Sequence, residues 1–380
     1  MRLWPWGSEA HGRRRAVLAF ATALAIVSAQ PQAARTDETK LRDLFAATIP
    51  DAQLAYAVTL LQGDQPPASL VQGLRFKGAE QTVSAESLWH IGSITKSFTA
   101  VLVLQLADEG RLDLDTPIGT YLSAHIAEMN SEWSNRTLRE LLSHTSGLRA
   151  NASTLDQLRT WPSDQTDARR DVLARHWSEP LSGMPGTYLY SNLGYVLAGF
   201  VAETVAGESW ETLIERRIAA PLGLTSLGFG PPVTLASAWG HSSLLGVLRP
   251  VNPRRATSAD NPAWMAPAGG LHMTIADLAA WGRFHVEACA GRRPHVLSAE
   301  RCLEMRNVVQ EGYGLGWILQ THPQTNGPIV LHNGSNTLWY AVLAIMPDDE
   351  AVVAIAHNTG RGRNVEVLAR ALVNAVMVGE

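Results

Sequence analysis

The apolar residues of this chain fall into short, strand-like runs near both ends and into longer, helix-like runs between them. Residues 54–61 and 69–76 are two short runs, and the Gly and Pro residues at 63–67 predict a turn between them, so the pair predicts a hairpin. Toward the C-terminus, four more runs predict strands, at 313–321, 329–332, 338–346 and 351–356. Turns are expected at 333–334 and 347–349, where Gly, Asn, Pro and Asp gather.

Helical spacing of apolar residues dominates the middle of the chain, from 112 to about 306. The spacing of Thr137 and Glu140 is that of a capping box and predicts the start of a helix. Residues 231–262, rich in Pro, Ser and Arg, predict a long irregular loop instead. Strands from both ends most simply join one antiparallel sheet, flanked by helices and with the helical block inserted between them. The predicted fold class is therefore α/β in its α+β form.

This pattern predicts a single domain over residues 30–380. Its sheet-forming part would comprise 30–110 and 310–380, and its mainly helical part 111–309.

The first residues look like an export signal. Three arginines at 13–15 precede an apolar run at 16–27 that is short for a membrane span, and small residues follow it at a suitable place for cleavage. We therefore expect a signal peptide over 1–29 and a periplasmic or secreted protein, by the general or the twin-arginine route. An uncleaved membrane anchor is the alternative.

Composition narrows the class of protein. Hydrophobic residues make up 46% of the chain and charged residues 17%, which suits a large buried core, and the net charge of −4 does not suggest a nucleic-acid partner. The two cysteines, Cys289 and Cys302, could form one disulfide in an exported protein, and their spacing matches no zinc pattern. No metal or cofactor is expected.

Candidate chemistry lies at the start of the longest apolar helical run, where Ser93 precedes Lys96 by three residues. That spacing is about one helical turn, so the two side chains share a face. The helix N-terminus would offer backbone N–H groups to an oxyanion. The chain has only three lysines, Lys40, Lys77 and Lys96. Because a desolvated lysine can lose its proton and an arginine cannot, a base for Ser93 is the favoured interpretation.

Three short motifs follow one another along the chain: Ser93-Ile94-Thr95-Lys96, Tyr190-Ser191-Asn192 and His332-Asn333-Gly334. Their order resembles that of serine β-lactamases and penicillin-binding proteins. The Tyr-x-Asn form is similar to class C β-lactamases, D-alanyl-D-alanine peptidases and the esterases of that fold. Residues 141–148, 221–224 and 267–271 also fit, so the resemblance covers essentially the whole chain after the signal.

The resemblance implies a role for each matching residue. Ser93 would be the acylated nucleophile, and Lys96 and Tyr190 would form its base, with the lysine ammonium lowering the pKa of the phenol. Asn192 would bind substrate and orient Lys96. The backbone N–H groups of Ser93 and Ser335 would form the oxyanion hole. Gly334, which ends the third motif just before Ser335, would belong to the same substrate-binding and oxyanion site.

Two positions bear on the substrate. His332 stands where β-lactamases of this kind usually carry lysine, which resembles the peptidase and esterase branches and argues against efficient β-lactam turnover. Near the final helix, Asn358 and Arg361 would meet a substrate carboxylate and offset in part the missing lysine. The alternative is an ordinary loop at the start of a helix with solvated arginines.

The resemblance implies an exported serine hydrolase that works through an acyl-enzyme on amides or esters. D-amino-acid peptidase or carboxypeptidase activity is the first hypothesis, on a small molecule or a peptide such as one derived from peptidoglycan. A carboxylesterase or a weak β-lactamase is the alternative. A non-catalytic binding module of the cell envelope is the hypothesis from another class.

Overall fold

The structure is a computed structural model that describes residues 30–49, 54–125, 129–158, 165–234, 237–254 and 259–379. The predicted signal peptide at 1–29 lies outside the described residues. Within them, no helix is both long and apolar enough to cross a bilayer.

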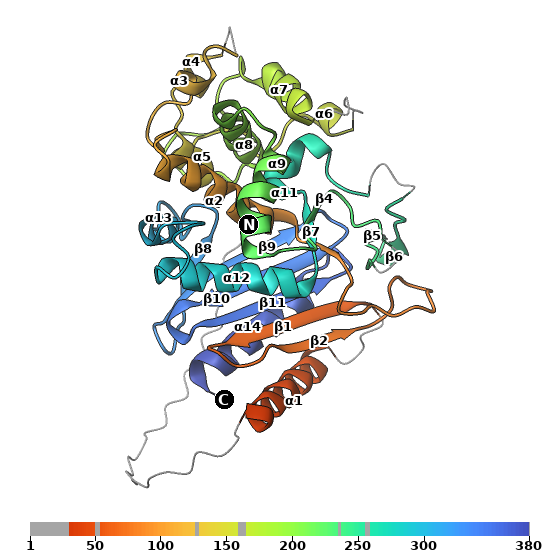
Figure 1. The fold of residues 1–380 in the computed structure, drawn as a ribbon. Helices are drawn as coiled ribbons and strands as arrows, with labels where there is room; N and C mark the ends of the chain where they lie inside the picture. The colour runs from red at the N-terminus through yellow and green to blue at the C-terminus, as the bar shows by residue number, and fades with distance from the viewer. Residues whose placement is uncertain are drawn as a thin grey trace.

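Strands from the two ends of the chain form one antiparallel sheet, as predicted, in the order β2-β1-β11-β10-β9-β8 (Figure 1). The strands are β1 (Tyr56–Gln62), β2 (Ala68–Gln72), β8 (Ile318–Thr321), β9 (Pro328–Ser335), β10 (Tyr340–Met346) and β11 (Ala351–His357). The register places Tyr340 between Ser335 of β9 and His357 of β11.

Helices cover both faces of this sheet (Figure 1). The helices α1 (Gln30–Thr48) and α14 (Arg363–Val378) pack on one face, where Val58, Val342 and Ile355 point toward them. The helix α12 (Ile275–Cys289) lies on the other face. Strand side chains alternate between the two faces, and helices cover both. All residues of the central strands β10 and β11 are therefore buried.

The inserted part is mainly helical, as the spacing predicted. Its helices are α3 (Gly119–Leu122), α4 (Ser131–Ser134), α5 (Leu138–Leu142), α6 (Thr154–Leu158), α7 (Gln165–His176), α8 (Asn192–Ala206), α9 (Trp210–Ile214), α10 (Ala220–Leu222), α11 (Ala266–Gly269) and α13 (Ala299–Met305). A small sheet of β3 (Trp89–His90), β7 (Leu271–Met273) and β4 (Gly228–Phe229) ties this part to the segment before Ser93. The capping box predicted at Thr137 and Glu140 opens α5 with both of its hydrogen bonds.

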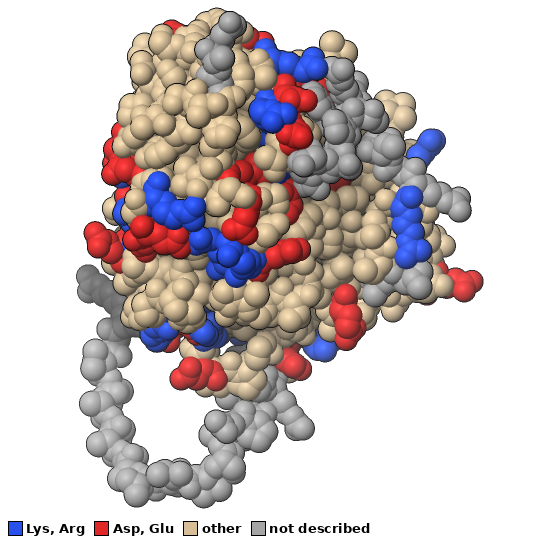
Figure 2. Space-filling view, turned by 45° about the horizontal axis from the view of Figure 1, so that its top comes forward, with Lys and Arg blue, Asp and Glu red and all other residues tan. Residues whose placement is uncertain are grey.

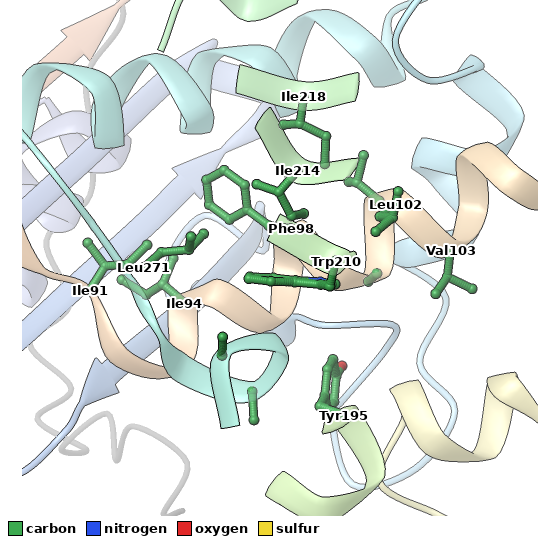
Figure 3. Close-up of a cluster of buried hydrophobic side chains, with 14 of the residues drawn as sticks. Ile91, Ile94, Phe98, Leu102, Val103, Tyr195, Trp210, Ile214, Ile218 and Leu271 are labelled. Atoms are coloured by element: carbon green, nitrogen blue, oxygen red, sulfur yellow. The ribbon is translucent and has the colours of Figure 1, made fainter. Parts of the chain in front are cut away.

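The helix α2 (Thr95–Asp108) runs through the centre of the molecule. Every residue from Thr95 to Ala107 is buried, which is typical of a helix surrounded by other elements. Figure 3 shows Phe98 and Leu102 of α2 packed among Trp210, Ile214 and Ile218. This core holds the first turn of α2 rigidly against its neighbours.

Three local predictions are wrong. Residues 333–334 are not a turn: β9 continues through Ser335, since the backbone at Gly334 lies against residues 91–93. Only Ile318–Thr321 of the predicted 313–321 strand forms β8. The expected loop at 231–262 contains a hairpin of β5 (His241–Leu244) and β6 (Val247–Pro250), whose Leu-Gly turn carries no ordinary hairpin signal.

Cys289 at the end of α12 and Cys302 in α13 are joined by a disulfide, with their Cα atoms 5.0 Å apart. That separation lies within the usual range for such a bond.

Candidate active site

Ser93 lies in a short 3₁₀ turn, Gly92–Ile94, that leads directly into α2. Its position depends on two glycines that allow this turn to touch β9. A β-carbon at Gly92, where φ is +52°, would lie 2.2 Å from the amide nitrogen of Ser335. A β-carbon at Gly334 would lie 2.6 Å from the amide nitrogen of Ser93. Since neither distance is sterically allowed, only glycine at both positions lets the turn and the strand meet.

This contact brings together the two backbone amides that the sequence nominated for an oxyanion hole, those of Ser93 and Ser335. The end of β9 is available for it because β8 pairs only with 328–331, so no strand of the described residues pairs with 332–335 on that side. Two N–H groups on facing segments are the arrangement that stabilises the charge of a tetrahedral intermediate.

Lys96 is fully buried one turn after Ser93. Its Nζ lies 2.8 Å from Asn192 Oδ1, 2.6 Å from the carbonyl oxygen of Ala268 and 3.1 Å from Ser93 Oγ. Burial lowers the pKa of Lys96 well below its usual range. A neutral amine has two hydrogens and one lone pair. Since the two carbonyl oxygens can only accept, they take the hydrogens and leave the lone pair facing Ser93.

Tyr190 lies on the other side of Ser93, and its hydroxyl donates to Ser93 Oγ over 2.8 Å. The expectation that a lysine ammonium lowers the pKa of this phenol is wrong. Burial raises the pKa of Tyr190 instead, because the lost solvation of a phenolate outweighs the hydrogen bond with Ser93, which acts in the opposite direction. The lysine Nζ lies 4.9 Å from the centre of the Tyr190 ring, but its own burial disfavours its charge. Tyr190 is thus a proton donor in the free protein.

Asn192 is the first residue of α8, whose N-cap Ser191 accepts from the N–H of Gly194. The Asn192 side chain accepts from Lys96 and donates to Asn151 Oδ1 over 2.7 Å. The geometry therefore fits the orienting role expected for Asn192, and it adds Asn151, for which no sequence signal was available.

His332 lies on the strand face that also carries Gly334, and it is fully buried. Its Nδ1 donates to the carbonyl oxygen of Asn333 over 2.6 Å, so Nε2 accepts from the Tyr313 hydroxyl over 3.1 Å. Burial, and to a smaller extent the nearby Lys96, lower the pKa of His332 to about 3. This histidine is therefore neutral near pH 7 and supplies no positive charge to the site around Ser93.

The side chains of Asn358 and Arg361 form their hydrogen bonds with groups other than the residues around Ser93. The buried Asn358 side chain accepts from the N–H of Ala55 and donates to the carbonyl oxygen of Arg75, so it joins β11 to the segments around β1 and β2. The Arg361 guanidinium donates to Ser243 Oγ and to the Gly246 carbonyl oxygen of the β5–β6 hairpin. Neither side chain has a hydrogen bond to Ser93, Lys96 or Tyr190 among the described contacts.

A buried histidine that the sequence analysis left without a role supports Tyr190. His144 accepts the N–H of Ser191 at Nδ1 over 3.0 Å, and its ring centre lies 4.3 Å from that of Tyr190. His144 has a φ of 61°, in the left-handed region that residues with a β-carbon rarely adopt. Its place inside the 141–148 stretch was the only available signal.

A second buried group links the two segments that carry the amides of the oxyanion hole. His90 Nδ1 accepts the N–H of Gly92, so its Nε2 carries a hydrogen and faces Asp260 Oδ1 at 2.9 Å. The same carboxylate oxygen accepts from Asn336 Nδ2 over 2.8 Å. Asp260 therefore connects the residue before Ser93 to the residue after Ser335. No local pattern pointed to this pairing.

Among the described residues, no group of three or more His, Cys, Asp and Glu side chains could hold a metal ion.

An antiparallel sheet with an inserted helical block, and a Ser-Lys pair at the start of a buried central helix, define a serine hydrolase of the β-lactamase and penicillin-binding-protein fold. A family model described as Beta-lactamase matches residues 36–377, so the chain belongs to the beta-lactamase family.

Relatives and solved structures agree with this membership. The chain is 29% identical over 332 residues to Penicillin-binding protein 4 of Amycolatopsis lactamdurans, which covers 82% of this chain and 81% of that protein. The structure of an octameric penicillin-binding protein homologue from Pyrococcus abyssi has a TM-score of 0.73 at 24% identity, over 90% of this chain and 78% of that one. A D-stereospecific amidohydrolase from Streptomyces sp. has a TM-score of 0.71 at 22% identity, over 90% and 99%. These two structures share the fold of this chain.

Proposed function

We propose that this enzyme forms an acyl-enzyme at Ser93 and hydrolyses amides or peptides of D-amino acids. The observation that carries the proposal is the hydrogen bonding of Lys96. The Nζ atom contacts the carbonyl oxygens of Asn192 and Ala268 as well as Ser93 Oγ, so a neutral amine here would give its two hydrogens to the carbonyl oxygens and turn its lone pair toward the Ser93 hydroxyl. A serine with a desolvated, neutral amine at hydrogen-bonding distance is an activated nucleophile.

In the proposed reaction, Lys96 takes the proton of Ser93 as Oγ attacks the substrate carbonyl carbon. The carbonyl oxygen becomes an oxyanion between the N–H groups of Ser93 and Ser335. When the tetrahedral intermediate collapses, the bond to the leaving nitrogen or oxygen breaks. The leaving atom takes the Tyr190 hydroxyl proton, and Lys96 returns its proton to Tyr190. Water then attacks the acyl-enzyme by the reverse sequence of proton transfers.

The substrate class is supported by two observations. The fold is shared with a D-stereospecific amidohydrolase, and a penicillin-binding protein is among the sequence relatives. The neutral His332 offers no positive charge, and Arg361 is bonded to the hairpin. We therefore propose that an uncharged amide or ester end is preferred over a free carboxylate, which shifts the favoured activity from carboxypeptidase to amidase. A peptide derived from peptidoglycan with an amidated end fits this class.

The same neutral His332 favours a second candidate, a carboxylesterase, since simple esters also lack a carboxylate at that position. The apolar run at 16–27 after three arginines supports the proposal that the enzyme acts outside the cytoplasm, in the periplasm or after secretion.

The test compares kcat/KM for D-alanine amide, L-alanine amide, a peptide that ends in D-alanyl-D-alanine, the methyl ester of that peptide, and a neutral acetate ester. The proposal expects the D-amide to exceed the L-amide, and the methyl ester to exceed the free peptide. If neither stereoisomer is hydrolysed and only the acetate ester reacts, the enzyme is a carboxylesterase. Mass mapping of a fluorophosphonate adduct to a residue other than Ser93 would overturn the mechanism.

A further inference from the structure

The turn of the β5–β6 hairpin contains a residue type that is unfavourable for the backbone conformation found there. Leu245 and Gly246 form its two-residue loop, with φ of 49° and 84°. Such turns favour Asn-Gly or Asp-Gly, because a β-carbon is strained in left-handed backbone. Leu245 is nevertheless there and is 96% exposed, beside Leu244 at 63% and Val247 at 53%. A strained leucine in full contact with water points to a partner outside the chain.

Beside this tip lies a cavity of about 460 Å³. Its lining includes three cationic side chains, Lys77, Arg361 and Arg363, and none of the described lining residues is acidic. The helix α14 begins at Arg363, and no side chain caps its first turn, so its N–H groups add to the positive potential. The cavity therefore suits an anion.

The tip and the cavity form one surface, because Arg361 connects them. Its guanidinium donates to Ser243 Oγ over 2.8 Å and to the Gly246 carbonyl oxygen over 3.0 Å. Leu248 of β6 lines the cavity. The hairpin projects from one side of the molecule in Figure 1, and Lys and Arg side chains lie along the same side in Figure 2.

We propose that this surface docks on an anionic lipid bilayer. The tip residues Leu244, Leu245 and Val247 would enter the interface, and the cavity would receive a phosphate headgroup. A few exposed apolar side chains beside several cations are typical of interfacial anchors. A protein partner is disfavoured, because a stable protein interface needs about 800 Å² on each side and this tip has three apolar side chains.

Docking would also orient the active site. His241 at the base of the hairpin donates its backbone N–H to the carbonyl oxygen of Leu338, in the segment that joins Ser335 to β10. Its ring accepts from the N–H of Lys77 and donates to the carbonyl oxygen of Asn358. The hairpin is therefore fixed to the elements that carry the oxyanion hole. This inference does not depend on which substrate the enzyme hydrolyses.

The test places an environment-sensitive dye on the tip of the full chain. The two native cysteines are disulfide-bonded, so Leu245→Cys creates a single free thiol. The dye should brighten and shift to the blue with vesicles of phosphatidylcholine and phosphatidylglycerol, and much less with phosphatidylcholine alone. A dye at Leu303→Cys, an exposed leucine of α13, is the matched control and should not respond. Any affinity of the apolar segment at 16–27 for lipid is common to both proteins.

Two further variants test the cationic cavity and the apolar tip of the hairpin separately. In the dye-labelled protein, Lys77→Gln with Arg363→Gln should weaken binding to anionic vesicles about 25-fold, at about fivefold per cation, and salt should weaken binding similarly. The control Arg170→Gln, on α7, should change it less than about twofold. In unlabelled protein, Leu245→Asn should reduce co-sedimentation with vesicles while leaving Tm equal or higher, since Asn-Gly suits the turn.

Five results would overturn the proposal. The dye at 245 gives no response to anionic vesicles, or responds equally to both kinds of vesicle. The double variant binds as the parent does. The dye responds to protein concentration without lipid, which would indicate contact with a second copy of the chain. Glycerol phosphate binds the cavity while vesicles do not, which would indicate a soluble anion as the ligand.

Discussion

Two groups of polar residues at the same edge of the sheet differ in how they are used. Around Ser93, Lys96 of α2 and Tyr190, two residues before α8, both hydrogen-bond to one reactive oxygen, Ser93 Oγ. At the end of β11 and the start of α14, Asn358 and Arg361 have equally good hydrogen bonds, but these end on backbone groups and on the hairpin. Residue type and motif position therefore suggest which residues form a functional site. The partners of their hydrogen bonds show whether those residues take part in the chemistry or stabilise the fold.

The largest effect that this comparison predicts is at the nucleophile. Ser93→Ala should lower kcat/KM by a factor on the order of 10⁴ or more, because a covalent nucleophile acts as a unit with its base. Labelling by a fluorophosphonate should disappear while the circular dichroism spectrum and Tm stay close to those of the parent. Activity within a few-fold of the parent would contradict the assignment of Ser93.

Lys96→Arg should be nearly as damaging as Lys96→Ala, with a loss on the order of 10³ in kcat. Arginine keeps a positive charge but cannot accept the Ser93 proton, and its guanidinium is larger than the buried site of the amine. Both variants are measured at several pH values on the preferred substrate. Recovery of most of the turnover by arginine would mean that Lys96 acts only as a charge.

Asn358→Ala tests the scaffold side of the comparison. The free energy of unfolding should fall by about 2–4 kcal/mol, because the buried N–H of Ala55 and the Arg75 carbonyl oxygen lose their partner. The kcat/KM of the protein that remains folded should stay within about twofold of the parent. Chemical denaturation and active-site titration provide the two measurements. A large loss of kcat/KM without a loss of stability would return Asn358 to the substrate site.

The buried His332 should give a pH dependence to stability. Its folded pKa, at about 3, lies below the usual value near 6.5, so the unfolded chain binds more protons between these pH values. Stability is thus lost as pH falls below about 6.5, by about 1.4 kcal/mol per pH unit from this group. His332→Gln should make the slope shallower, whereas His295→Gln, on an exposed histidine, should not change it. Equal slopes for parent and His332→Gln would contradict the burial argument.

The smallest effect is expected at Arg361. Arg361→Ala should leave kcat/KM within about twofold for a peptide with a free carboxylate and for its methyl ester, since the guanidinium is bonded to the hairpin. A selective loss for the free carboxylate alone would restore this arginine to substrate recognition. It would also move the proposed activity back toward a carboxypeptidase.

The sequence by itself determined the fold class of this protein and the main residues of its candidate site. Apolar runs of strand length at both ends and helical spacing between them were enough to predict one antiparallel sheet with a helical insertion, because burial of alternating or periodic residues is a local property of the chain. The spacing of Ser93 and Lys96 predicted a shared face, and the capping box at Thr137 predicted the start of α5. The order of the three motifs identified the residues that meet around Ser93.

Only the tertiary structure decided the protonation states of those residues and the contacts that hold them in place. The pKa values of Tyr190 and His332 depend on burial by segments far away in the chain, so no local pattern could show that both remain neutral. The strand at 333–334 and the bridge from His90 through Asp260 to Asn336 exist only because β9 lies against the turn before α2. Contacts between residues that are distant in sequence follow from packing, and packing is a property of the whole fold.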